Sequence, residues 1–197
     1  TPTMFTFCFS AWGLILAVNA VVLWKRDESF TLRAWLTFSY LICRVVLFSF
    51  AVTSLITDII KKTVGAPRPY YITALTAHEA GELSERDWVN ATQSFVSGHA
   101  SESWSLLFLM TLYFYHSYSY AMKQYATQRS VAPYSTTNPH SYFFVHLWYK
   151  LAPMPLVSIL LMFIPTFGAL FVALTRMIDY KHTAADITAG ALIGAVT

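Results

Sequence analysis

The chain contains 197 residues, of which 56% are hydrophobic and only 12% are charged. A soluble domain has about 25% charged residues, so this composition excludes an ordinary soluble enzyme and predicts an integral membrane protein. The net charge of +3 is small and scattered along the chain, which argues against nucleic acid as a partner.

Five apolar stretches predict membrane spans, each of which needs about 20 mostly apolar residues. They cover residues 4–24, 36–60, 100–120 and 154–174, and the start of a fifth stretch covers 184–196. We therefore predict an all-α, polytopic transmembrane helical bundle, with residues 1–197 forming a single membrane-embedded domain. Because the chain begins with a threonine and stops inside an apolar run, we expect it to be truncated at both ends.

The connections between these stretches differ in length and charge. Residues 25–33 are short and charged, 61–96 are long and partly acidic, 123–153 are polar, and 175–181 are brief. Because successive spans cross the membrane in alternate directions, the second and fourth connections lie on one side and the first and third on the other. The residues discussed next, at positions 61–68, 97–99 and 176–186, all belong to the former side, which favours one composite site.

Two features bear on which side of the membrane this site faces. Lys and Arg outside the candidate site weakly favour a cytoplasmic location for the first connection. The sequon Asn90-Ala91-Thr92 lies in the second connection, and N-glycosylation of Asn90 requires that connection to be lumenal or extracellular. We therefore expect the site to face away from the cytosol, at the plasma membrane or at an internal membrane.

Arg176, His182 and Asp186 have a spacing suited to nucleophilic chemistry. Residues four apart share a helix face, so the Asp186 carboxylate can bond one ring nitrogen of His182 and leave the other free to attack. Arg176 can clamp phosphate oxygens through two parallel hydrogen bonds. The alternative is a plain helix start at a membrane interface, where His and Asp are common.

Ser97, Gly98 and His99 directly precede a long apolar helix. Backbone N–H groups at a helix N-terminus attract an anion, and a glycine permits its close approach. His99 can act as the general acid that protonates a departing alkoxide. Alternatively, Ser97 is only a helix N-cap and His99 is incidental.

Lys61 and Arg68 flank a short turn that contains Pro67 and Pro69. Pro69 biases Arg68 toward an extended backbone, which would fix its guanidinium in the loop. Lys61 ends an apolar helix, where a lysine can also serve only as an interfacial cation whose charge reaches the membrane surface.

Together these segments resemble the type 2 phosphatidic acid phosphatase superfamily, whose signature is K-x6-R-P, then P-S-G-H, then S-R-x5-H-x3-D. Val96 replaces the usual proline and Thr175 the usual serine, and both departures are mild. The wider segments 94–101 and 179–186 look most like the lipid phosphate phosphatases of eukaryotes.

The resemblance implies six transmembrane helices, of which the first lies outside this chain, and a site on the extracytoplasmic face. It implies that His182 is the nucleophile that forms a phosphohistidine and that Asp186 orients it. His99 would protonate the leaving alkoxide and later activate water. The phosphate oxygens would be held by five residues, namely Lys61, Arg68, Ser97, Gly98 and Arg176. The family chemistry needs no metal and no other cofactor.

The function that we expect is metal-independent hydrolysis of a lipid phosphate monoester, such as phosphatidate or lysophosphatidate, in the membrane. A polyprenyl phosphate phosphatase or a lipid phosphotransferase would use the same site. A non-enzymatic signalling or scaffold relative is a further alternative, although all the motif residues with chemical roles are present. The sequence leaves homo-oligomer formation open.

Overall fold

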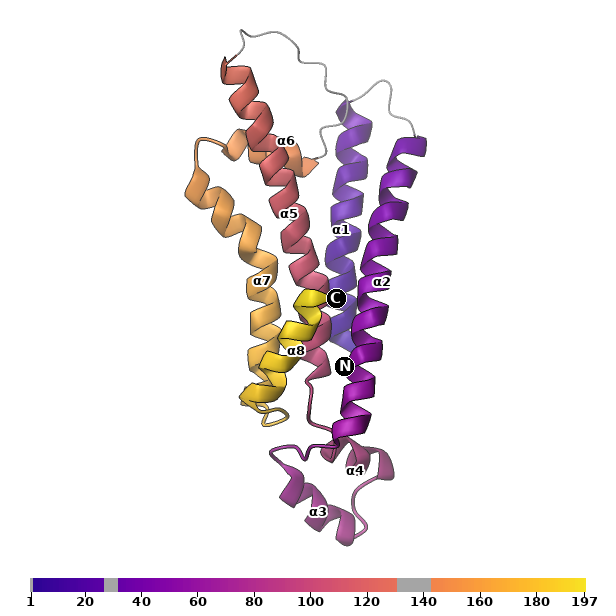
Figure 1. Cartoon of the computed structure of the whole chain (residues 1–197). Helices are drawn as coiled ribbons and strands as arrows, with labels where there is room; N and C mark the ends of the chain where they lie inside the picture. The colour runs from indigo at the N-terminus through magenta and orange to yellow at the C-terminus, as the bar shows by residue number, and fades with distance from the viewer. Residues whose placement is uncertain (1, 27–31, 131–142) are drawn as a thin grey trace. The chain divides into compact units, whose positions relative to one another are not determined.

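The computed structural model describes residues 2–26, 32–130 and 143–197, and the regular structure within these ranges is entirely α-helical (Figure 1). The all-α prediction is therefore confirmed, and each of the five apolar stretches falls in a helix. In chain order the helices are α1 (Pro2–Arg26), α2 (Leu32–Val64), α3 (Tyr71–Glu79), α4 (Glu85–Ala91), α5 (Gly98–Ser130), α6 (Phe143–Leu151), α7 (Pro155–Ile178) and α8 (Ala184–Val196).

Two of these helices are long and apolar enough to cross a membrane, judged by length and composition. They are Trp35–Val64 within α2 and Pro155–Ile178, which is α7. The apolar segments Cys8–Val21 and Ala184–Val196 are shorter. The other three predicted spans stay a prediction.

The short helices α3 and α4 were not predicted from the sequence. They pack against each other, with the His78 ring stacked on Trp88 at a centroid distance of 4.6 Å. Ser84 caps α4, because its hydroxyl accepts a hydrogen bond from the Asp87 N–H at 3.2 Å. Helices of one or two turns gain their stability from such local contacts rather than from a long apolar repeat. The hydrophobic pattern of the sequence therefore did not reveal them.

The chain divides into two compact units, and the first comprises residues 1–45 and 110–165. One cluster of its core contains four buried side chains, to which aromatic residues of α5 and α6 add. The Asn19 amide of α1 donates hydrogen bonds to the Ile15 carbonyl at 2.9 Å and to the Tyr113 hydroxyl at 3.5 Å. The four core residues are Ala121, Val145, Trp148 and Met162.

The second unit comprises residues 46–109 and 166–197, and paired hydroxyl groups join its helices. Ser49 of α2 bonds Ser105 of α5 at 2.7 Å, and Thr57 bonds Ser101 at 2.8 Å. Ser54 donates to the Glu102 carboxylate at 3.1 Å. Because buried polar groups need partners, these bonds fix the register of α2 against α5.

Helix α8 packs closely on the start of α5 through its glycines (Figure 1). A Cβ atom added to Gly190 would lie 2.6 Å from the Ser97 carbonyl oxygen and 3.2 Å from the Ala100 Cβ. Gly194 leaves no room for a Cβ against the Ser101 backbone either. This close packing brings the N-termini of α5 and α8 together.

We predict that Gly190→Ala destabilises the protein by about 1–3 kcal/mol, because the added methyl group meets backbone atoms that have no room to move. The apparent Tm in detergent should fall relative to the parent chain. Gly168→Ala is the matched control, because its added Cβ meets only Leu107 Cδ1 at an ordinary 3.5 Å. Equal Tm values for the two variants would contradict this packing.

Candidate active site

All eight residues of the candidate site belong to the second unit. Lys61 lies in the last turn of α2, Arg68 in the connection that follows, and Arg176 in the last turn of α7. Ser97, Gly98 and His99 lie at the start of α5, and His182 and Asp186 flank the start of α8. The second unit therefore contains all three sequence motifs.

The predicted pairing of His182 with Asp186 is present, but its backbone geometry differs from the prediction. His182 precedes the N-cap Thr183 and so is not on the same helix as Asp186. Its Nδ1 lies 3.6 Å from the Asp186 Oδ2, and both residues are only 4% exposed. The turn before α8, rather than a shared helix face, brings the two side chains together.

A capping box fixes the Asp186 carboxylate. The Thr183 N–H donates to the Asp186 Oδ2 at 2.8 Å, and the Asp186 N–H donates to the Thr183 Oγ1 at 3.3 Å. This reciprocal arrangement satisfies two N–H groups at the helix start and holds the carboxylate in one orientation. Asp186 therefore faces His182 in a position set by the helix itself.

Ser94 is a site residue that the sequence reasoning missed. Its hydroxyl donates to the Asp186 Oδ2 at 2.5 Å and lies 3.4 Å from the His182 Nδ1. Ser94 is only 1% exposed. The spacing of the motif residues did not identify this serine, which lies three residues before the Ser-Gly-His motif. It appeared only as part of the wider segment 94–101.

The pKa of His182 is lowered to about 4. Burial is the largest cause, and the positive charges of Arg68 and Lys61 lower the pKa further, while Asp186 and a backbone hydrogen bond with Ser94 oppose the shift. The imidazole is therefore neutral at pH 7. Because Nδ1 faces a carboxylate, it carries the ring proton, and Nε2 keeps its lone pair.

Lys61 and Arg68 supply cationic groups that an anion can use. A Cβ added to Gly98 would lie 3.0 Å from the Lys61 Nζ, so the ammonium group lies against the glycine of the second motif. The Arg68 Nε is buried and has no hydrogen-bond partner in the described residues. Because buried donors in proteins are almost always satisfied, this atom marks a place for a bound acceptor.

Backbone hydrogen bonds hold the three motifs in register. The Ser94 N–H donates to the Ala66 carbonyl at 2.7 Å, and the Arg68 N–H donates to the Ala91 carbonyl at 2.9 Å. The Ser97 N–H donates to the Asp186 carbonyl at 3.1 Å. The N-cap interpretation of Ser97 also holds, because its hydroxyl accepts from the Ala100 N–H at 3.4 Å.

Arg176 has partners of its own. Its Nη2 lies 3.0 Å from the Asp179 Oδ2, and its Nε and Nη2 donate to the Thr175 hydroxyl at 3.3 and 3.2 Å. Thr175, which departs from the usual serine, thus keeps a hydroxyl on the guanidinium. The Arg176 carbonyl accepts the His182 N–H at 3.3 Å, which ties the end of α7 to the turn that carries His182.

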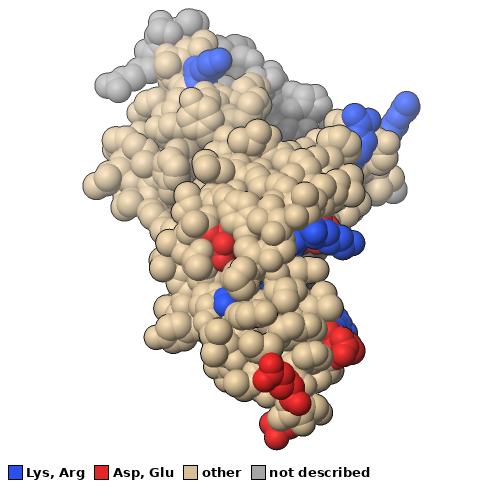
Figure 2. Space-filling model, turned by 60° about the horizontal axis from the view of Figure 1, so that its bottom comes forward, with Lys and Arg blue, Asp and Glu red and all other residues tan. Residues whose placement is uncertain are grey.

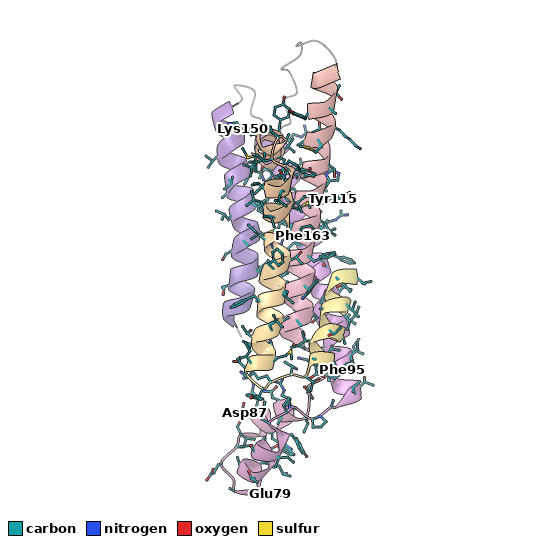
Figure 3. The ribbon with its side chains drawn as sticks, turned by 90° about the vertical axis from the view of Figure 1, so that its left-hand side faces the viewer. Glu79, Asp87, Phe95, Tyr115, Lys150 and Phe163 are labelled. Atoms are coloured by element: carbon teal, nitrogen blue, oxygen red, sulfur yellow. The ribbon has the colours of Figure 1, made fainter. Side chains whose placement is uncertain are left out.

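Four exposed acidic residues lie on α3, on α4 and on the turn between them. Figure 2 shows carboxylates gathered on the part of the molecule formed by α3 and α4, and Figure 3 shows Glu79 and Asp87 on these helices and Phe95 on the segment that leads to α5. The four acids in this part of the molecule are Glu79, Glu82, Glu85 and Asp87.

A comparison with protein families matches residues 43–197 to the PAP2 superfamily, and this range includes every residue of the candidate site. Comparisons with curated proteins and with solved structures gave no match. The matched range is well over half of the chain and agrees with the geometry of the three motifs. The chain therefore belongs to the PAP2 superfamily, whose members are phosphatases that act on phosphate monoesters.

Proposed function

We propose that the protein hydrolyses the phosphate monoester of a membrane lipid, such as phosphatidate or lysophosphatidate, through a phosphohistidine intermediate. One observation carries the proposal. A buried imidazole is paired with a carboxylate, and the same unit holds the buried Arg68 Nε, which has no hydrogen-bond acceptor among the described residues. This arrangement suits nucleophilic attack on a bound anion.

In the proposed mechanism, Lys61, Arg68 and Arg176 hold the phosphate oxygens together with N–H groups at the start of α5. The His182 Nε2 attacks phosphorus, the P–N bond forms, and the P–O ester bond breaks. Burial and the nearby positive charges of Arg176 and Lys61 lower the pKa of His99 to about 3 in the free protein. The bound phosphate offsets these positive charges, so His99 takes up a proton as the substrate binds. His99 gives this proton to the departing alkoxide, which leaves as the lipid alcohol. His99 then takes a proton from water, whose oxygen attacks phosphorus and releases inorganic phosphate and free His182.

The lipid nature of the substrate is supported by the two candidate spans and by the apolar surface of α7. Phe163, Phe167 and Phe171 of α7 are 39%, 57% and 69% exposed, and an apolar face of this kind suits contact with lipid chains. We propose five spans in this chain and lateral access of the substrate from the bilayer. The motif segments 94–101 and 179–186 favour a relative of the eukaryotic lipid phosphate phosphatases.

Sidedness forms part of the proposal. Asn90 lies in the last turn of α4 and is exposed, as a glycosylated asparagine must be. The connection that carries it also carries Lys61 and Arg68 at its start. A glycan at Asn90 would therefore place the catalytic groups on the extracellular or lumenal face.

Phosphate release from phosphatidate in detergent micelles with EDTA tests the function. We predict robust release by the parent chain and a loss of about 10⁴-fold or more in His182→Ala, because the nucleophile is removed. His116→Ala is the matched control, since His116 is exposed and lies in the other unit. Activity retained by His182→Ala would contradict the nucleophile assignment. No release from any lipid or prenyl phosphate would favour the scaffold alternative.

The pH dependence of kcat/KM tests the charge state of His182. With a pKa of about 4, the His182 imidazole stays neutral at pH values well below the ordinary histidine pKa of about 6.5. The acidic limb of the kcat/KM profile that comes from the enzyme should therefore lie near pH 4. In Arg68→Gln the loss of a nearby positive charge should raise this pKa and move the limb to higher pH. The ionisation of the substrate phosphate, near pH 6, is common to both proteins. An enzyme limb at the same pH in both would contradict this electrostatic account.

Glycosylation mapping in a eukaryotic host tests sidedness. We predict a glycan on the parent chain that is lost in Asn90→Gln, seen as a shift in electrophoretic mobility. As a matched probe of the opposite side, Tyr134→Asn in the Asn90→Gln background creates the sequon Asn-Ser-Thr in the third connection. This second variant should carry no glycan. A glycan on the new sequon, with none on Asn90, would reverse the proposed orientation.

A further inference from the structure

Ser94 hydrogen-bonds to the loop that leads to Arg68 and to Asp186, and it lies beside His182. Its N–H donates to the Ala66 carbonyl in the loop that leads to Arg68. Its hydroxyl donates to Asp186 and lies beside His182. Along the chain it stands three residues before Ser97. The loop before Arg68, His182 and Asp186 thus all contact one buried residue, the loop through its backbone N–H and the other two through its hydroxyl.

The distances show why a bridging hydroxyl matters. The His182 Nδ1 and the Asp186 Oδ2 are 3.6 Å apart, which is too long for a direct hydrogen bond. Ser94 donates its only proton to the carboxylate at 2.5 Å, so the lone pairs of its oxygen face the Nδ1–H at 3.4 Å. The resulting chain runs from imidazole to hydroxyl to carboxylate.

We infer that Ser94 is a positioning residue that links the His182 Nδ1–H to the Asp186 carboxylate and fixes both for attack, an inference that rests on the proposed function. Ser94 transfers no proton and touches no substrate. When Nε2 bonds to phosphorus, the imidazole becomes positively charged while Nδ1–H is retained. The serine then keeps the compensating carboxylate in place through a charge-assisted hydrogen bond.

The role differs from that of an ordinary buried serine. Ser103 of α5 is also fully buried, but its hydroxyl donates to the Ala100 carbonyl of its own helix at 3.2 Å. Ser103→Ala therefore removes a buried hydroxyl from the same unit without touching the site. It serves as the matched control for Ser94→Ala.

The test is a double-mutant cycle with phosphate release from phosphatidate as the readout. We expect Ser94→Ala to lower kcat by about 10- to 100-fold, the effect of losing one hydrogen bond to a charged group, with KM nearly unchanged. In the Asp186→Asn background, the same substitution should lower kcat by less than about 3-fold, because a residue that acts through Asp186 has little left to orient. Ser103→Ala should keep the parent kcat.

Two results would overturn the inference while leaving the proposed function intact. One is a kcat for Ser94→Ala equal to that of Ser103→Ala, and the other is an equal loss in both backgrounds. If Ser94→Ala fails to fold, Ser94→Cys keeps the side-chain volume with a weaker donor, and the same criteria apply to it. No phosphate release by the parent chain would overturn the function itself, and the role of Ser94 with it.

Discussion

The Asp186 carboxylate is the point on which the rest of the site depends. One of its oxygens accepts hydrogen bonds from the Thr183 N–H and the Ser94 hydroxyl and faces the His182 ring. The first bond belongs to the capping box that begins α8, and the second comes from the segment before α5. A carboxylate held in this way keeps hydrogen-bond partners although it is buried, because protein donors replace the lost water. The Asp186 Oδ2 therefore takes part in the cap of α8 and also faces the imidazole of His182.

Contacts between the helices of the second unit, away from the candidate site, hold these side chains in position. Gly190 lets α8 approach the Ser97 carbonyl, and hydroxyl pairs such as Thr57 with Ser101 fix α2 against α5. In a site of this kind, the substrate's charge is stabilised by groups that are already in place, so their positions determine the rate. Small residues and hydroxyls within the helices thus hold the candidate site residues in place.

The sequence predicted the helical class, and its candidate site residues fall in one compact unit, but the local geometry differs from the prediction. Spacing identified His182 and Asp186, but it placed them on one helix, whereas a turn and the N-cap Thr183 bring them together. Spacing also missed Ser94, because its partners lie 88 and 92 residues away and no local pattern encodes contacts of that range. The helices α3 and α4 escaped prediction because ring stacking and a serine cap, rather than a long apolar repeat, stabilise them.

The central claim is that His182 becomes phosphorylated within this cluster, and rapid-quench labelling tests it most directly. The parent chain would be mixed with phosphatidate labelled in its phosphate, quenched in base within milliseconds to seconds, and assayed for label bound to protein. The account predicts an acid-labile, base-stable phosphoenzyme that maps to His182 and is absent from His182→Ala. Turnover without any labelled protein, or label that persists in His182→Ala, would contradict it.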